Sequence, residues 1–117
     1  MHNRGIDDRA TAFFEDVVVF TQTISSAPGT LRTIEQLVSA AGSVPANRCE
    51  ATEGSSRREF IRFNKLALRG ARESVVWLRG CQAGRWGSQD SCARLLDEAD
   101  QLIRILTAIV KNSKRDD

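Results

Sequence analysis

Several residue types are scarce in this 117-residue chain, and each scarcity argues against a class of chemistry. The chain has no tyrosine and a single histidine, His2, close to its N-terminus. One terminal histidine leaves no candidate for a histidine-based general base or catalytic triad. The sequence also contains no glycine-rich phosphate loop and no dinucleotide fingerprint. We therefore expect a protein that is not an enzyme and that carries no cofactor.

Cysteines and long apolar runs are scarce as well. Cys49, Cys81 and Cys92 are an odd number and lack the C-x-x-C spacing, so neither a disulfide framework nor a metal site is expected. We interpret them as small core-filling side chains in a reducing cytoplasm. The longest apolar run, VVVF at residues 17–20, is far shorter than the roughly 20 residues that cross a membrane. The polar N-terminus also lacks the apolar segment of a secretory signal, so no membrane partner is expected.

The apolar residues that are present recur at intervals of three and four, which is the period of an amphipathic helix. This pattern predicts helices at residues 8–26, 31–50, 57–83 and 89–112, and no segment has the alternation of a strand. The length suits one domain, residues 1–117. Long helices with short connections predict an all-α fold, an antiparallel up-down-up-down four-helix bundle.

A proline, Pro45, lies in the middle of the second expected helix. Proline inside a helix costs ~3 kcal/mol because it removes a hydrogen bond and clashes with the preceding turn. The next strong helix start is Ser56, which with Glu59 has the form of a capping box. We therefore expect the helix to kink at Pro45 rather than end there. Asn47 and Glu50 are expected to satisfy backbone groups that the proline leaves free, although a role for this pair at a subunit interface stays open.

Positive charge is concentrated in one segment. Residues 56–86 carry eight basic and two acidic residues, a net charge of +6, whereas the whole chain carries +2. The rest of the chain is therefore at −4. Six of the cations follow steps of four, three, four, three and seven, which places them on one helix face. This basic stripe consists of Arg58, Arg62, Lys65, Arg69, Arg72 and Arg79.

The basic stripe has more than one interpretation. A row of cations can neutralise phosphates, so RNA, DNA or another polyanion is one candidate partner. The stripe can also be a solvated face, or it can pair with Asp97, Glu98 and Asp100 of the last helix, within one chain or between subunits. Replacement of Arg62 and Arg69 by glutamate separates these interpretations. The double replacement is expected to abolish binding if the partner is nucleic acid. It is expected to dissociate the oligomer if the stripe forms ion pairs between subunits.

Two of the expected helices are apolar over more of their surface than a small bundle requires. The helix at 57–83 has two neighbouring apolar stripes, and the helix at 8–26 has one broad face. The broad face consists of Phe13, Phe14, Val17, Val18 and Phe20. A helix in a small bundle needs one stripe. The surplus favours a second buried face and hence self-association, with a wide core as the alternative.

The segment from Gln36 to Leu78 resembles the family of four-helix-bundle proteins known as 23S rRNA intervening-sequence proteins. The matching residues are Gln36, Leu37, Ala40, Ala41, Ser43, Val44, Pro45, Ala46, Asn47, Glu50, Ser56, Glu59, Phe60, Ile61, Arg62, Phe63, Ala67 and Glu73. The sequence departs from the family pattern at Arg48-Cys49, at Ala51 and at Gly70. The proline motif and the start of the third helix are shared, so Ser43, Pro45, Asn47, Glu50, Ser56 and Glu59 are expected to serve the fold.

The resemblance implies an all-α bundle that assembles as a homo-oligomeric ring, typically a homopentamer, with no established enzymatic activity. Relatives include the accessory variability protein of diversity-generating retroelements, which assists a reverse transcriptase and binds nucleic acid. We therefore expect a cytoplasmic scaffold or binding module whose partners are other copies of itself and, through the basic stripe, nucleic acid or a nucleic-acid-handling protein. The alternative is a purely structural oligomer whose stripe forms salt bridges between subunits.

Overall fold

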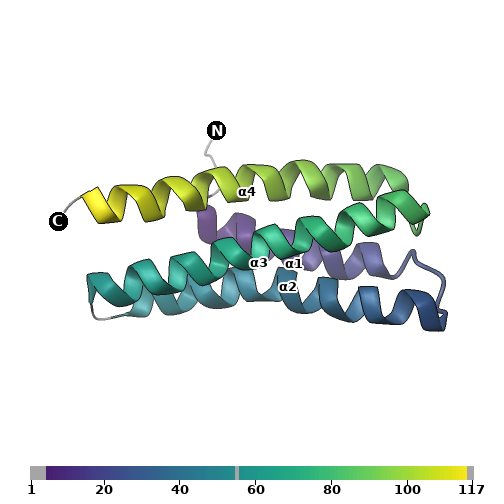
Figure 1. Cartoon of the computed structure of the whole chain (residues 1–117), viewed down its shortest axis with the longest axis horizontal. Coiled ribbons are helices and arrows are strands. Elements are labelled where there is room, and N and C mark those ends of the chain that lie inside the picture. The colour runs from purple at the N-terminus through teal and green to yellow at the C-terminus, as the bar shows by residue number, and fades with distance from the viewer. Residues whose placement is uncertain (1–4, 55, 116–117) are drawn as a thin grey trace.

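The computed structural model describes residues 5–54 and 56–115 and shows four helices, with no strand among these residues. They are α1 (Ile6–Thr21), α2 (Pro28–Glu53), α3 (Arg57–Gly84) and α4 (Gln89–Arg115). Each helix packs against its neighbour in the chain, and α1 also packs against α4. Successive helices run in opposite directions along the long axis (Figure 1). The chain is thus an all-α four-helix bundle, as the sequence predicts.

One helix is much shorter than the others. α1 has 16 residues, whereas α3 has 28. At 1.5 Å per residue these lengths correspond to about 24 and 42 Å. Figure 1 shows that α1 leaves one end of the bundle uncovered. At this end the C-terminal part of α2, the N-terminal part of α3 and the C-terminal part of α4 lie together.

The first helix ends earlier than the sequence suggests. α1 stops at Thr21 rather than near residue 26. The hydroxyls of Thr21 and Thr23 donate hydrogen bonds to carbonyls three residues earlier, at 2.6 and 2.7 Å. The following backbone amides also bond to carbonyls three residues back, so the chain tightens and leaves the helix.

The second helix begins earlier than expected, at Pro28 rather than at residue 31. Proline is tolerated in the first turn of a helix, where its missing N–H has no intrahelical partner to lose. The Thr30 hydroxyl accepts a hydrogen bond from the Ala27 amide at 3.0 Å. Pro28 and Thr30 therefore open α2 one turn before the expected start.

α2 continues through Pro45 to Glu53. The Asn47 side-chain amide donates a hydrogen bond to the Ser43 carbonyl at 2.8 Å. The carbonyl that Pro45 leaves without a backbone partner is that of Ala41, four residues earlier, so this bond is not the expected one. The exposed side chain of Glu50 makes no hydrogen bond within the described residues, so Glu50 does not satisfy that carbonyl either.

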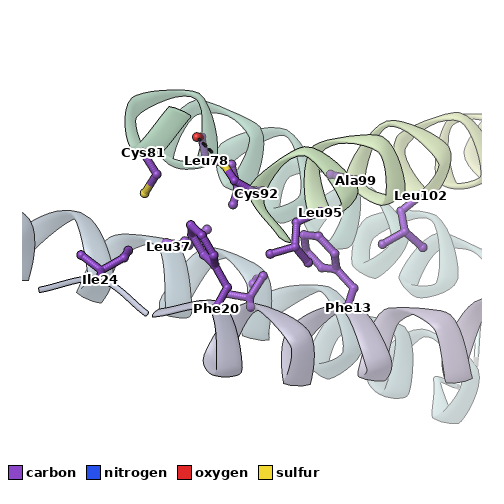
Figure 2. Close-up of a cluster of buried hydrophobic side chains, with 12 residues drawn as sticks. Phe13, Phe20, Ile24, Leu37, Leu78, Cys81, Cys92, Leu95, Ala99 and Leu102 are labelled. Atoms are coloured by element: carbon purple, nitrogen blue, oxygen red, sulfur yellow. Dashed lines mark hydrogen bonds between the residues drawn. The ribbon is translucent and has the colours of Figure 1, made fainter. Parts of the chain in front are cut away.

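The core draws apolar side chains from all four helices. Phe13 and Phe20 of α1 lie beside α4 residues such as Leu95 in Figure 2. Burial of each such side chain stabilises the fold by about 1.5–3 kcal/mol. A second cluster continues the core toward the uncovered end and includes Val44 and Leu106. No helix in the described part of the chain is long and apolar enough to cross a membrane.

Two of the three cysteines belong to this core. Cys81 and Cys92 are fully buried, and the Cys92 thiol donates to the Leu78 carbonyl at 3.3 Å (Figure 2). Burial raises the pKa of Cys81 to about 11, so its thiol stays neutral at physiological pH. Cys49 differs from the expectation, because it lies exposed on α2. Its thiol contacts Glu53 at 3.4 Å, and this contact raises the pKa of Cys49.

Candidate functional site

The basic stripe lies on the outer face of α3. The core-facing side of this helix carries buried residues such as Asn64, Ala71 and Leu78. All six cations of the stripe are exposed to solvent. The three-and-four spacing thus predicted the shared face correctly, because a helix returns to the same face at those intervals.

The stripe has few partners within its own chain. Arg69 forms an ion pair with Glu73 at 3.6 Å, with 73% of its side-chain surface exposed, so the pair contributes little stability. The Arg62 guanidinium lies 4.4 Å from the centre of the Phe63 ring. Arg58, Arg72 and Arg79 make no hydrogen bond or ion pair with another described residue. These cations are therefore available to an external anion.

Lys65 has an unusual neighbour at the uncovered end of the bundle, Lys114 of α4. The ammonium groups of Lys65 and Lys114 can only donate hydrogen bonds, so their proximity favours a neutral nitrogen on Lys65, and the two positive charges also repel each other. Both effects lower the pKa of Lys65, although its side chain is fully exposed to water. Lys111 lies one turn before Lys114, on the same face of α4, and is exposed. The stripe thus widens into a two-helix cationic surface, which the spacing within one helix could not reveal.

The acidic residues of α4 do not neutralise the stripe within the chain. The three candidates were Asp97, Glu98 and Asp100. Arg9 of α1 binds Glu98 through two hydrogen bonds of 2.9 and 3.1 Å. Arg104 pairs with Asp100 at 3.2 Å, and Gln101 donates to Asp97 at 3.2 Å. Within the part of the chain that the structure describes, the intramolecular pairing considered for the stripe is therefore absent.

Ser43 and Ser56 of the motif shared with the family form hydrogen bonds with backbone groups. The Ser43 hydroxyl donates to the Ala40 carbonyl at 2.7 Å, where α2 approaches α3. Ser56 caps α3 by accepting a hydrogen bond from the Glu59 amide at 3.1 Å. The reciprocal bond of a full capping box is not made by the Glu59 side chain in the described residues. These residues shape helix ends and a helix crossing and do not converge on a ligand.

Arg48 is a buried polar residue for which the sequence pattern alone predicted no role. Its side chain is only 8% exposed and links three helices. The guanidinium donates from Nε to Asp7 Oδ1 of α1 and from Nη1 to Asn64 Oδ1 of α3, each at 2.8 Å. Asn64 is fully buried and donates in turn to the Phe60 carbonyl at 2.8 Å. A signal was present, because Arg48 continues the apolar spacing of Ala41 and Val44.

A second surface of opposite charge lies between α1 and α4. It is a groove of about 540 Å³, and we call it the α1–α4 groove. Its lining includes the 60% exposed side chain of Val19 together with Asp16, Asp97 and Glu98, against a single cation, Arg94. Asp16 makes no hydrogen bond or ion pair with a described residue. No pattern within one helix indicates this groove, because it depends on how α1 and α4 are paired.

Among the described residues, no group of three or more histidine, cysteine, aspartate or glutamate side chains could hold a metal ion.

Comparisons with known proteins address the family. The sequence profile described as "23S rRNA-intervening sequence protein" matches residues 5–108. No curated protein matches the chain. A solved structure from Bacteroides thetaiotaomicron, described as a protein of unknown function from the S23 ribosomal protein family, superimposes with a TM-score of 0.84. The alignment covers 92% of this chain and 99% of that chain.

At 20% sequence identity, the structural likeness supports the shared fold alone. The sequence profile is more specific, because it covers α1, α2, α3 and the larger part of α4. Profile and fold agree with the resemblance carried by the proline motif. The chain belongs to the 23S rRNA-intervening sequence protein family.

Proposed function

We propose that this chain is a non-enzymatic scaffold that self-associates and binds nucleic acid through the basic stripe. One observation carries the binding part of the proposal. The stripe is exposed, has a single ion pair within the described chain, and places Lys65 beside Lys114 although the two charges repel. Such repulsion persists in the free protein and is relieved when an anion lies between the two ammonium groups.

Nucleic acid fits this surface better than a small anion. The part of the stripe from Arg58 to Arg69 extends over 11 residue steps, which corresponds to about 17 Å of helix. A line of that length matches several successive phosphates, and their neutralisation releases condensed counterions. No exposed aromatic row accompanies the cations among the described residues of α3. The proposed contact is therefore to the phosphate backbone and has little base specificity.

Self-association is the second part of the proposal. The family resemblance implies a homopentameric ring, and the broad apolar faces favour a further buried surface. A cyclic assembly would repeat the stripe around the ring, so that weak individual contacts add by avidity. Free cysteines, one of them exposed, fit a reducing cytoplasm.

The competing function is a purely structural oligomer in which the stripe pairs with carboxylates of another subunit. The carboxylates in the α1–α4 groove favour this alternative. The two functions differ in which end of the stripe matters. Nucleic-acid binding requires the Lys65–Lys114 end, whereas the groove has no direct role in it.

The test is a matched pair of charge reversals. Lys65→Glu changes a residue of the two-helix cationic surface. Arg32→Glu changes an exposed residue of α2 and alters the net charge by the same amount. Fluorescence anisotropy with a labelled RNA duplex and a DNA duplex of the same sequence measures affinity as a function of salt. Lys65→Glu is expected to weaken binding at least tenfold and to lower the slope of log K against log salt by about one or more. Equal effects of the two reversals would contradict a specific role for the stripe.

A further inference from the structure

Two exposed valines suggest how copies of the chain associate. The described residues include three exposed large apolar side chains: Val19 at 60%, Leu31 at 48% and Val76 at 63%. Single exposed apolar residues are common and do not by themselves indicate an interface. Leu31 lies beside one charge of each sign, Arg32 and Glu35. Val19 instead follows Glu15 and Asp16 by one turn, whereas Val76 lies between two unpaired arginines, and the acidic Glu73 near it is paired with Arg69.

Val76 stands within the basic stripe. Val76 lies four residues after Arg72 and three residues before Arg79, so the three residues share one face of α3. Neither arginine makes an ion pair or hydrogen bond with a described residue. We call this set the α3 patch. It presents an apolar centre between two unpaired guanidinium groups.

Val19 lies in the α1–α4 groove, which is acidic, whereas the α3 patch is basic. Asp16 stands one turn before Val19 on α1, and Asp97 faces it from α4. Glu98 is already bound by Arg9, and the groove holds one cation, Arg94. The carboxylates that remain can accept hydrogen bonds from arginines, which bind carboxylates in bidentate geometry. The groove therefore complements the α3 patch in both charge and apolar content.

The two surfaces also lie at the same end of the bundle. The Ser88 amide donates to the Thr23 hydroxyl at 2.9 Å, so the end of α1 is level with the start of α4. The Cys92 thiol bonds to the Leu78 carbonyl, so the start of α4 is level with Leu78 of α3. Val19 is about one turn from Thr23, and Val76 is within one turn of Leu78. A rotation without a large axial shift can therefore bring the patch of one copy to the groove of another.

We infer that the chain binds a second copy of itself head to tail, with the α3 patch of one copy seated in the α1–α4 groove of the next. α1 and α3 are not neighbouring helices in the bundle, so the two surfaces face different directions on one chain. Repetition of such a heterologous contact gives a closed ring when the rotation closes. This inference rests on the self-association in the proposed function and leaves the Lys65–Lys114 end of the stripe free for nucleic acid.

The experiment uses two variants that each retain one surface. Val19→Asp removes the apolar centre of the groove and leaves the α3 patch, whereas Val76→Asp does the reverse. Multi-angle light scattering is expected to find the unmodified chain oligomeric and each variant monomeric. An equimolar mixture of the two variants is expected to form a 1:1 complex of two chains. Leu31→Asp is the matched control and should keep the unmodified mass. Far-UV circular dichroism checks that all variants are folded.

The outcomes separate this inference from the proposed function. A monomeric unmodified chain at every concentration would overturn both the interface and the proposed self-association. An oligomer that survives Val19→Asp or Val76→Asp would overturn the interface alone. Two monomeric variants that fail to combine when mixed would refute the head-to-tail geometry.

Discussion

At the residue scale, Arg48 shows how a departure from the family pattern is accommodated. A buried guanidinium is costly unless its donors are satisfied and its charge is paired. Here Asp7 provides the charge, and Asn64 accepts a further hydrogen bond in a site closed to water. No buried side-chain nitrogen or oxygen among the described residues lacks a partner. Arg48 therefore ties α1, α2 and α3 together from a position on the buried face of α2.

Loss of Arg48 should consequently destabilise the fold. Arg48→Ala removes the buried partner of Asn64 and is expected to cost ~3 kcal/mol of unfolding free energy. Arg48→Met retains the volume of the side chain and is expected to cost about 1–2 kcal/mol. Urea unfolding of chains that also carry Val76→Asp measures this without a contribution from self-association. Arg58→Ala, exposed and unpaired, should change stability by no more than ~0.5 kcal/mol. A similarly small effect of Arg48→Ala would refute the proposed tie.

At the element scale, Gly70 of α3 packs closely against the backbone of α2. A Cβ atom at this position would lie 2.8 Å from the Ala40 carbonyl oxygen and would also collide with the Ser43 hydroxyl. Because the carbonyl belongs to the backbone of α2, only a shift of a whole helix could relieve the contact. Glycine is thus required here by packing, in spite of its low helix propensity.

Two glycine substitutions in α3 should therefore have opposite effects. Gly70→Ala is expected to lose about 1–3 kcal/mol of stability because it overpacks the crossing. Gly80→Ala adds a Cβ that meets nothing within 4 Å and is expected to gain about 0.5–1 kcal/mol from helix propensity. Urea unfolding in the same Val76→Asp background compares the two. Stabilisation by Gly70→Ala would contradict the close crossing.

Sequence periodicity predicts α3 and α4 well because one helix face must be apolar along its whole length. It predicts helix ends less well. The last turn expected for α1 is lost to threonine side-chain hydrogen bonds, and Pro28 opens a helix as well as ending the preceding loop. Sequence periodicity does not predict which side chains of different helices contact each other. Lys114 beside Lys65 and Asp7 beside Arg48 become neighbours only when the bundle forms.

At the scale of the whole molecule, opposite charges are separated on the bundle. The uncovered end, where α1 is absent, carries the lysines of α3 and α4 (Figure 1), whereas the other end carries the α3 patch on one face and the carboxylates of the α1–α4 groove on another. This separation allows one chain to use two surfaces at once. The stripe then serves a polyanion near Lys65 and another copy of the chain near Val76.

The most direct test of this division is one variant measured in two ways. Arg62→Glu combined with Lys65→Glu reverses the polyanion end and leaves the α3 patch and the α1–α4 groove intact. Light scattering is expected to give the mass of the unmodified oligomer, while anisotropy with the labelled RNA duplex is expected to show binding at least a hundredfold weaker. A fall to the monomer mass, or RNA binding at the unmodified affinity, would contradict the account.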